Sequence, residues 1–493
     1  MTVPRVLAID QGTSGTTCLV VGADGAIAGR GYAEVPVRYP RDGWVEQDAE
    51  DLWQSVLTAA RDAISAAGDP ALVAVGVTNQ RETTVVFDRR SLVPVAPAIV
   101  WQCRRSTAIC AAHRERGEET MVRARTGLLL DPYFTATKLE WLLGDQPELR
   151  ERAERGELCG GTVDTWLIAR MTGGDVLVTD PSNASRTLVY ALATGRFDDE
   201  LCAMFSVPAA MLAEIRPSAG RVGYTEPSRF LGLRLPISGI AGDQQAALFG
   251  QACVWPGMSK NTYGTGSFVL VNAGTTAPAP AHGLLSTVAW RLGEVDTFAL
   301  EGSIFVTGAG IKWLRDGLGV LSAADQAGPL FDSVPDSNGC TFVPALSGLG
   351  APFWDPDARG ALLGISAGVT RAHVVRAVVE AMAYRTRDVV EAMEAGGGIA
   401  LAELRVDGGA SVMDGLCQFQ ADLLGLPVTR AGSPDTTAVG AAMLAAVGEG
   451  LIEAPDGVAT AYQAGRRFEP AHPGQRPQES YQAWLRAIER VRS

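Results

Sequence analysis

The stretch Ile237–Phe268, ISGIAGDQQAALFGQACVWPGMSKNTYGTGSF, decides how the rest of the chain is interpreted. Asp243 follows a short apolar run and a glycine, and the sequence YGTGS at 263–267 leads into an expected strand. Because glycine has no Cβ, backbone N–H groups beside Gly264 and Gly266 can approach an anion closely. The stretch therefore offers a carboxylate and a phosphate-binding loop, and we interpret it as the segment that joins two domains across a cleft.

The length and composition of the chain indicate a globular protein of two domains. A chain of 493 residues is too long for one hydrophobic core, and we expect domains at residues 1–247 and 248–493. An apolar content of 47% and a charged content of 20% are ordinary for an enzyme. The net charge of −13 argues against binding to the nucleic-acid backbone. A small phosphate ligand needs only a local electropositive pocket, so it is not excluded.

The sequence predicts a cytoplasmic protein without a membrane span. No apolar run approaches the length that crosses a bilayer, and the N-terminus lacks the charged-then-apolar pattern of secretory signals. The 8 cysteines and 4 histidines are scattered, and there is no C-x-x-C pair. A zinc site or a disulfide framework is therefore not expected.

A glycine- and threonine-rich hairpin is expected near the N-terminus. The apolar run Val6–Ile9 predicts a buried strand that ends in Asp10, and Cys18–Val21 predicts the next strand. Backbone N–H and hydroxyl groups at the tip of such a hairpin can hold phosphate. No lysine follows the glycines and G-x-G-x-x-G is absent, so the turn is neither a Walker loop nor a dinucleotide fingerprint. The candidate phosphate ligands are Gln11, Gly12, Thr13, Ser14 and Gly15.

The same design recurs in the second half of the chain. The loop at 263–267 precedes the apolar strand Phe268–Val271, and a third glycine-rich stretch, Leu404–Ala410, lies at a strand end before a helical segment. Two phosphate hairpins and a late Asp-Gly-Gly loop resemble the actin-like ATPase fold, in which two related domains clamp a nucleotide. The resemblance implies an α/β protein with two actin-like ATPase (ribonuclease H-like) domains flanking a central cleft.

Two polar clusters follow apolar strands in the first half. Leu72–Val77 is an expected strand that delivers Thr78–Thr84, and Ala98–Val100 delivers Trp101–Arg105. Sheets of α/β proteins bind ligands at the carboxyl ends of their strands. We therefore interpret both clusters as parts of a ligand site rather than as solvated turns.

Longer segments resemble the glycerol-phosphorylating members of the FGGY carbohydrate kinase family. The resemblance is carried by residues 78–84, 99–105, 131–134, 161–166, 179–186 and 237–249, and by two family signatures, YFTATKLEW at 133–141 and GALLGISAGVTRAHVVRAVVE at 360–380. It implies ATP-dependent phosphorylation of glycerol to sn-glycerol 3-phosphate, with Mg²⁺ as the metal. It also implies a homo-oligomer, either a dimer or a tetramer.

The resemblance assigns roles to individual residues. It implies a glycerol site lined by Arg81, Glu82, Trp101, Tyr133, Asp243, Gln244 and Phe268. Asp243 is implied as the base that accepts the proton of the attacking hydroxyl, and Asp10 as the carboxylate that holds Mg²⁺ through water. The implied ATP ligands beyond the first hairpin are Thr265, Gly266, Gly308, Lys312, Gly409 and Met413. Trp101 and Phe268 can supply an apolar wall for the carbons of glycerol, while polar groups bind its hydroxyls.

Three positions depart from the pattern of these kinases, and all of them concern the nucleotide. Thr17 stands where an arginine is expected in the first hairpin. Met413 stands where an asparagine is expected near the adenine, and Lys312 stands where a glutamine is usual.

Two other functions stay open at the level of the sequence. One is an FGGY kinase for another small polyol or ketose, such as erythritol, dihydroxyacetone or xylulose. Larger substrates would need smaller groups than Trp101 and Phe268. The other is a non-catalytic, actin-like ATP-binding protein, which would have no use for the polar cluster around Arg81, Glu82 and Tyr133.

Helical patterns complete the expected fold. Apolar residues recur at helical spacing in Glu50–Ala67 and Thr370–Ala395, and Gly396–Gly398 is expected to end the second of these helices. Thr436–Val447 is rich in alanine and glycine, which suits close helix packing. A last amphipathic helix is expected around Tyr481–Val491.

Overall fold

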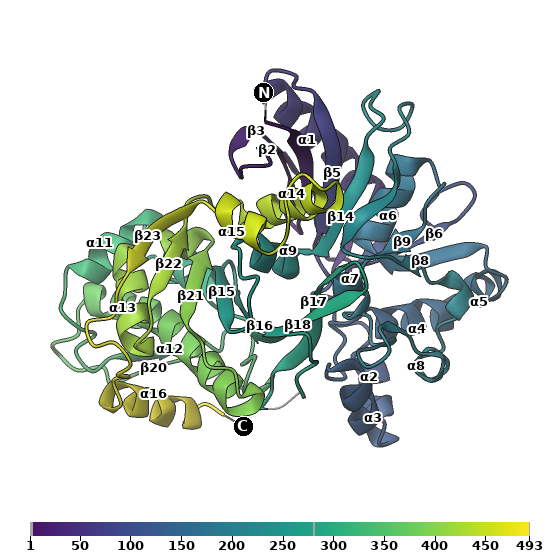
Figure 1. Cartoon of the computed structure of the whole chain (residues 1–493). Helices are drawn as coiled ribbons and strands as arrows, with labels where there is room; N and C mark the ends of the chain where they lie inside the picture. The colour runs from purple at the N-terminus through teal and green to yellow at the C-terminus, as the bar shows by residue number, and fades with distance from the viewer. Residues whose placement is uncertain (1–2, 280–281, 493) are drawn as a thin grey trace.

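The computed structural model describes residues 3–279 and 282–492 and is built on a thirteen-stranded mixed sheet that runs through both halves of the chain (Figure 1). In spatial order the strands are β23 (Ala464–Phe468), β22 (Val428–Ala431), β21 (Glu403–Asp407), β15 (Met258–Tyr263), β16 (Ser267–Gly274), β18 (Val295–Ile304), β17 (Leu285–Leu292), β13 (Ala219–Tyr224), β14 (Pro236–Gly242), β5 (Leu72–Asn79), β1 (Arg5–Gln11), β2 (Gly15–Gly22) and β3 (Ile27–Glu34). The strands of the two halves meet where β13 and β17 pair in parallel through Ala219 and Leu292.

The two halves repeat one strand pattern. In the first half, β1, β2 and β3 form an antiparallel meander, and β5 and β14 extend it in parallel beyond β1. In the second half, β15, β16 and β18 form the meander, and β21 and β22 extend it in parallel beyond β15. The repeat brings the hairpin turns β1–β2 and β15–β16 to equivalent places in the two halves, as the two glycine-rich loops predict.

Helix α1 (Ala49–Ala66) covers one face of the first half of the sheet. Its apolar side chains, including Leu52, Trp53 and Val56, are buried against β2 and β3, which gives the expected amphipathic helix its core face. The side chain of Asp48 caps the helix by accepting from the backbone N–H of Glu50. Helix α6 (Val163–Thr172) contributes Trp166 to the same core.

Helix α14 (Thr436–Gly448) comes from the second half of the chain but packs on the other face of the first half. It lies against β14, β5 and β1 and against α9 (Asp243–Gly250), as Figure 1 shows. A Cβ added to Gly440 would overlap the carbonyl oxygen of Ala246, so the two helices approach more closely than larger residues allow. The apolar residues of this helix join the two halves through one shared core.

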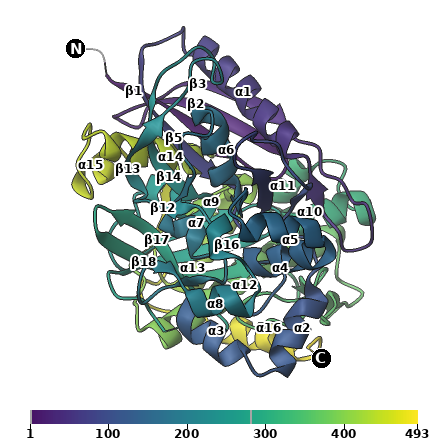
Figure 2. The same ribbon diagram turned by 90° about the vertical axis from the view of Figure 1, so that its right-hand side faces the viewer.

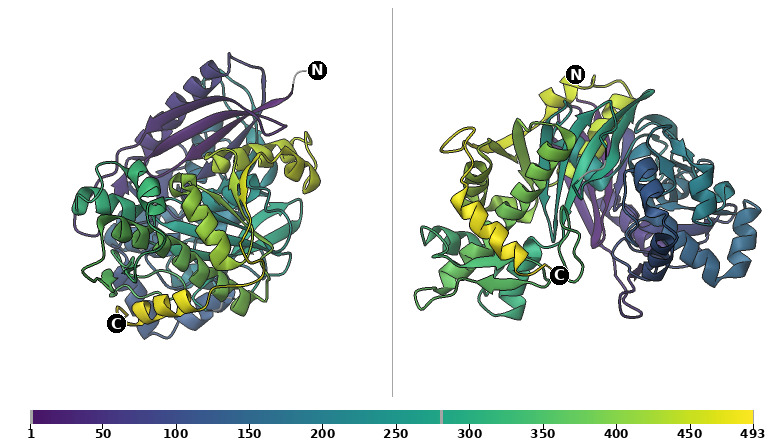
Figure 3. Two further views of the ribbon diagram at one scale, coloured as in Figure 1. Left: turned by 90° about the vertical axis from the view of Figure 1, so that its left-hand side faces the viewer. Right: turned by 90° about the horizontal axis from the view of Figure 1, so that it is seen from below.

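The second half has its own core around α12 (Arg371–Gly397), the longest helix. It begins after Thr370, which forms a capping box with His373, and it ends at Gly398 in a left-handed conformation. The helices packed with it are α11 (Ala327–Asp332), α13 (Asp414–Leu424) and the last helix, α16 (Glu479–Glu489). Figure 3 shows α16, in yellow near the C-terminus, on the outside of this half.

An outer layer of the first half is built on a small four-stranded sheet of β4 (Glu46–Gln47), β7 (Ala98–Ile99), β6 (Thr84–Asp88) and β8 (Leu158–Thr162). The helices of this layer are α2 (Thr107–Glu115), α3 (Glu119–Thr126), α4 (Thr135–Asp145), α5 (Pro147–Glu154) and α8 (Asp199–Met204), which face the viewer in Figure 2. Because β6 follows β5 after a short loop, this layer holds the residues between the two strands against the end of the main sheet.

The remaining α-helices and strands are short: α7 (Pro181–Ala184), α10 (Gly308–Lys312), α15 (Asp456–Ala461), β9 (Val178–Thr179), β10 (Tyr190–Ala191), β11 (Arg196–Phe197), β12 (Glu214–Ile215), β19 (Thr341–Val343) and β20 (Ala361–Leu363). Among the helices of residues 3–279 and 282–492, none combines the length and apolar character that crossing a membrane requires. All 8 cysteines are free and buried.

Candidate active site

Arg81 and Glu82 lie at the carboxyl end of β5, where the sequence placed a ligand site. Both side chains are almost completely buried. Glu82 has a φ of 60°, a left-handed conformation that is uncommon for a residue other than glycine. Strained backbone of this kind persists where its surroundings hold it in place, and it gathers at functional sites.

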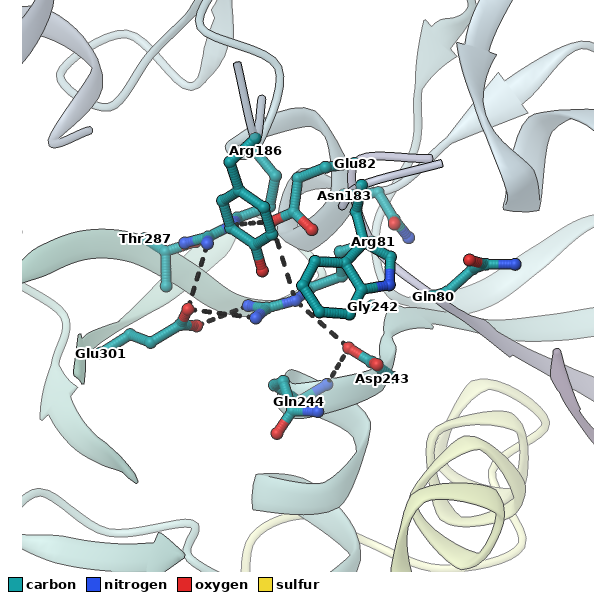
Figure 4. A network of polar contacts seen from close by, with 12 residues as sticks. Gln80, Arg81, Glu82, Asn183, Arg186, Gly242, Asp243, Gln244, Thr287 and Glu301 are labelled. Carbon is teal, nitrogen blue, oxygen red and sulfur yellow. Dashed lines mark hydrogen bonds and ion pairs between the residues drawn. The ribbon is translucent and has the colours of Figure 1, made fainter. Parts of the chain in front are cut away.

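The charges of these two residues are balanced in a buried network that Figure 4 shows. Arg81 donates through Nη1 and Nη2 to the carboxylate of Glu301, at 2.5 and 3.1 Å. Arg186 donates through Nε to Glu82 at 2.6 Å and through Nη2 to Glu301 at 3.0 Å. Burial by itself raises the pKa of Glu301, but the charges of Arg186 and Arg81 outweigh burial and lower this pKa to about 2. The network therefore holds two arginines and two carboxylates, with Glu301 ionised.

Asp243 begins α9 directly after β14 and faces Arg81. Its Oδ1 lies 3.2 Å from Nε of Arg81, and its side chain is 29% exposed, so a ligand can reach it. A Cβ on Gly242 would lie 2.6 Å from Cγ of Arg81, so only glycine fits before this carboxylate. Burial raises the pKa of Asp243, while Arg81 and Lys260 act to lower it. A carboxylate with a raised pKa beside a cation is suited to accept a proton.

Three aromatic side chains surround the polar network. The rings of Trp101 and Tyr133 meet edge to face with their centroids 5.6 Å apart. The guanidinium of Arg81 lies 5.7 Å from the ring centroid of Phe268, and that of Arg186 lies 5.7 Å from the ring centroid of Tyr133. The aromatic residues expected at the acceptor site are therefore brought together with Arg81 and Asp243.

Gln244 follows Asp243 at the start of α9 and contacts it directly. Its backbone N–H donates to Oδ1 of Asp243 at 2.7 Å, while its side chain accepts a hydrogen bond from Nζ of Lys260. Lys260 is completely buried on β15, and burial lowers its pKa to about 8 even though Asp407 and Asp243 act to raise it. The side-chain amide of Gln244 is thus held by Lys260, and the backbone N–H of Gln244 binds Asp243.

The first hairpin connects the acceptor residues to the expected phosphate site. Gly12 N–H donates to the carbonyl of Gly15 at 2.9 Å, which closes the turn between β1 and β2. Trp101 donates through Nε1 to Oγ1 of Thr13 at 2.8 Å, and Thr13 donates in turn to Gln80 at 3.2 Å. The indole ring is therefore fixed by the hairpin. Gln11 is completely buried, and Ser14 lies exposed at the tip.

The second loop is tied by its backbone to the start of α10. The N–H groups of Gly308 and Ala309 donate to the carbonyls of Gly264 and Thr265, both at 3.0 Å. A Cβ on Gly308 would lie 2.7 Å from the carbonyl oxygen of Gly264, so this glycine is required for the close approach of two chain segments. A Cβ on Gly266 would similarly overlap the carbonyl oxygen of Ile304. These two glycines therefore shape the loop, which leaves Gly264 and Thr265 exposed.

The remaining expected nucleotide residues are Gly409, Met413 and Lys312. Gly409 begins a short 3-10 segment, and no atom would lie within 4 Å of a Cβ added to it, so space is present beside its backbone. Met413 ends the same segment and packs at the edge of the core of the second half. Lys312 is exposed at the end of α10. The described contacts do not join Lys312 to the other two residues.

Asp10 lies at the end of β1, opposite Thr17 on β2. Burial raises the pKa of Asp10 to about 8, and the carboxylates of Asp243 and Asp435 add to this effect. Within the described residues, no group of three or more His, Cys, Asp or Glu side chains is arranged to hold a metal ion. Mg²⁺ is usually bound by one or two carboxylates together with phosphate oxygens and water, so the donor set at Asp10 fits this ion.

Arg186, Glu301, Lys260 and Lys138 belong to this site, although the sequence did not assign them to it. Glu301 interrupts the apolar run FALEGSI of β18, and a charged residue inside a buried strand is a signal of a polar partner. Lys138 is completely buried on α4 and donates to the carbonyls of Glu82 and Tyr133 at 2.9 and 2.6 Å. No comparable signal in the sequence points to Arg186, whose partners are far away along the chain.

The class of protein follows from comparison with known families. The model of the FGGY family of carbohydrate kinases, N-terminal domain, matches residues 5–250, and that of the C-terminal domain matches residues 259–449. The chain therefore belongs to the FGGY family of carbohydrate kinases, which confirms the predicted family.

Individual relatives narrow the comparison to one kind of kinase. The chain is 48% identical to glycerol kinase of Carboxydothermus hydrogenoformans, with 100% of this chain and 99% of the relative covered. It is 49% identical to glycerol kinase 2 of Thermotoga maritima, with 98% of each covered. Among solved structures, glycerol kinase of Plasmodium falciparum with ADP matches with a TM-score of 0.92 and 29% identity, covering 99% of this chain and 98% of that one. This likeness confirms the predicted α/β fold of two domains.

Proposed function

We propose that this chain transfers the γ-phosphoryl group of ATP to glycerol, giving sn-glycerol 3-phosphate. The observation that carries the proposal is the acceptor site, in which Arg81, Glu82 and Asp243 lie together beside an aromatic wall and next to two glycine-rich hairpins. The full-length likeness to proteins named glycerol kinase supports the choice of acceptor.

In this proposal the acceptor hydroxyls bind to Arg81 and Glu82, and the carbons of glycerol pack against Trp101, Tyr133 and Phe268. Asp243 accepts the proton of the attacking hydroxyl as the bond to phosphorus forms. Phosphoryl transfer asks a protein mainly for alignment and charge stabilisation, so fixed side chains matter more than a reactive nucleophile. Trp101, whose indole is tied to Thr13 in the first hairpin, couples the acceptor site to the phosphate site.

The nucleotide side of the proposal rests on the two hairpins and the open segment at Gly409. The tip at Gln11, Gly12, Thr13, Ser14 and Gly15 and the loop at Thr265 and Gly266 hold the β- and γ-phosphates through backbone N–H and hydroxyl groups. Gly308, Lys312, Gly409 and Met413 lie along the path of the nucleoside. Asp10 holds Mg²⁺, which when bound neutralises charge on the phosphates.

The domain boundary, the location in the cell and the oligomeric state belong to the same proposal. The family models meet near the expected division into residues 1–247 and 248–493, which supports that boundary. We place the protein in the cytoplasm because its substrate ATP is there, and we expect a dimer or a tetramer. Light scattering coupled to size-exclusion chromatography measures the oligomeric state directly.

The activity is tested by incubating the purified protein with ATP, Mg²⁺ and glycerol and identifying the product by ³¹P NMR. Glycerol 3-phosphate and ADP are expected in equal amounts. ATP binding without formation of a phosphorylated polyol would instead support a non-catalytic, actin-like ATP-binding protein.

A further inference from the structure

Glu301 comes from the second half of the chain, but the two arginines that bind its carboxylate come from the first half. It lies on β18, and its side chain has no exposed surface. Oε2 accepts from Nη1 of Arg81, and Oε1 accepts from Nη2 of Arg81 and from Nη2 of Arg186. Ser303 also donates to Oε1, at 3.3 Å. Both oxygens accept hydrogen bonds and the side chain has no exposed surface, so Glu301 itself does not face a substrate.

The hydrogen bonds to Glu301 determine which nitrogens of Arg81 and Arg186 face Asp243 and Glu82. Both terminal nitrogens of Arg81 are bound to Glu301, and Nη1 also donates to Gln245 at 3.2 Å. The nitrogen that faces Asp243 is therefore Nε, which makes no aligned hydrogen bond there despite the separation of 3.2 Å. In Arg186, Glu301 holds Nη2 and leaves Nε to bind Glu82.

If the terminal nitrogens of Arg81 were not bound to Glu301, they could bind the carboxylate of Asp243 instead. Guanidinium groups bind carboxylates most strongly through two parallel hydrogen bonds. Asp243 is the nearest carboxylate to Arg81 that is not already paired with another arginine. A two-point pair between Arg81 and Asp243 would occupy the oxygens that must accept a proton.

We propose that Glu301 is a positioning residue of the acceptor site. Glu301 binds both terminal nitrogens of Arg81 and Nη2 of Arg186. It thereby prevents a two-point pair between Arg81 and Asp243, so that Asp243 can accept the proton of the acceptor hydroxyl. The inference rests on the proposed function of this site and adds a residue from the other half of the chain to it. It follows that the acceptor site is complete only when the side chain of Glu301 on β18 reaches Arg81 and Arg186.

If Glu301 had only a structural role, its removal would lower stability without a specific change in kinetics. Asp388 provides a matched control for this alternative. Asp388 in the second half is also buried and ion-paired, with Arg385 at 2.7 Å, and it accepts from Tyr481 at 2.8 Å. Removing the charge of either carboxylate leaves an arginine buried without its partner, which lowers stability. A positioning role for Glu301 requires a kinetic change that Asp388→Asn does not share.

The experiment compares Glu301→Gln, Glu301→Asp and Asp388→Asn with the wild-type protein, using glycerol and ATP varied separately. Glu301→Gln is expected to lower kcat by about tenfold or more, the size of effect typical for a misplaced reacting group. The KM values for ATP and glycerol are expected to change much less. Glu301→Asp keeps the charge on a shorter side chain, so its kcat should lie between those of the wild type and Glu301→Gln. Asp388→Asn should lower Tm and leave kcat and both KM values close to those of the wild type.

A second measurement asks whether Glu301 acts through Asp243. In an Asp243→Asn background, Glu301→Gln is expected to cause little further loss of kcat, because residues that act as a unit are not additive. Equal losses in both backgrounds would overturn the inference, and so would a folded Glu301→Gln variant with wild-type kcat. Should Glu301→Gln fail to fold, the same comparisons are made with Glu301→Asp. A wild-type protein that does not phosphorylate glycerol would overturn the proposed function, whereas an active wild type with an unimpaired Glu301 variant would overturn this inference alone.

Discussion

The acceptor side and the nucleotide side of the site are built in different ways. On the acceptor side, buried charged side chains from β5, β18 and the segment after α7 hold one another in place before any ligand binds. On the nucleotide side, the contacts are mostly between backbone groups, and Thr265, Lys312 and Ser14 are exposed. In the proposed function, acceptor choice would therefore depend on a pre-formed array, and nucleotide binding on backbone donors and Mg²⁺.

The strongest test of the acceptor side is Asp243→Asn. The amide keeps the shape of the side chain but cannot accept the proton, so turnover should fall by about 10²–10⁴-fold. Glycerol binding should be retained, because Arg81 and Glu82 remain paired in the network. Steady-state kinetics measure turnover, and calorimetry measures glycerol binding. Turnover within a few-fold of the wild type would mean that Asp243 is not the base.

Acceptor choice is the next largest expected effect. If the array is pre-formed, kcat/KM for glycerol should exceed that for xylulose and ribulose by about 10²-fold or more, because a longer chain meets the wall of Trp101 and Phe268 and leaves polar groups unpaired. Trp101→Ala should narrow this ratio, since it removes the ring that Thr13 holds in place. A wild-type preference for a ketopentose would contradict the assignment and favour another FGGY kinase activity.

The nucleotide side is tested at Thr17, the cross-strand neighbour of Asp10. An arginine at this position would add a charge-assisted donor near the transferring phosphate, and such donors are roughly twice as strong as neutral ones. We expect Thr17→Arg to raise kcat or lower the KM for ATP by a few-fold, with little change in the KM for glycerol. Lys312→Gln should have the opposite effect if that lysine compensates. Absence of both changes would show that the missing charge is supplied by another group.

The smallest effect concerns the pH dependence of stability through Lys138. Burial lowers the pKa of Lys138 to about 7 in the folded protein, from 10.5, while Glu82 acts to raise it. Between these two values the unfolded chain binds the proton and the folded chain does not, so this group stabilises the fold increasingly as pH rises and loses that contribution as pH falls through about 7. The Tm of the wild type minus the Tm of Lys138→Met should therefore increase by roughly 2–4 °C from pH 6 to pH 9. A constant difference would indicate that Lys138 keeps its ordinary pKa.

Much of the fold follows from patterns that are local in the sequence. The expected strand Leu72–Val77 is part of β5, the helix expected from Thr370 is α12, and the helix expected at Thr436–Val447 is α14. These elements could be predicted because apolar periodicity and capping residues act within a few turns or strand positions. The resemblance to the FGGY family was also readable, since its signatures are continuous segments.

The sequence by itself also determined which residue types gather at the ends of β5, β14 and the two hairpins, because the polar residues directly follow each strand along the chain. Only the tertiary structure decided how those clusters are held. Arg81 and Glu301 are separated by 220 positions, and Arg186 and Glu301 by 115, so nothing local links them. A buried charge requires a partner but does not specify which one. The partner is selected by the order of strands in the sheet, which brings β18 of the second half against the acceptor residues of the first.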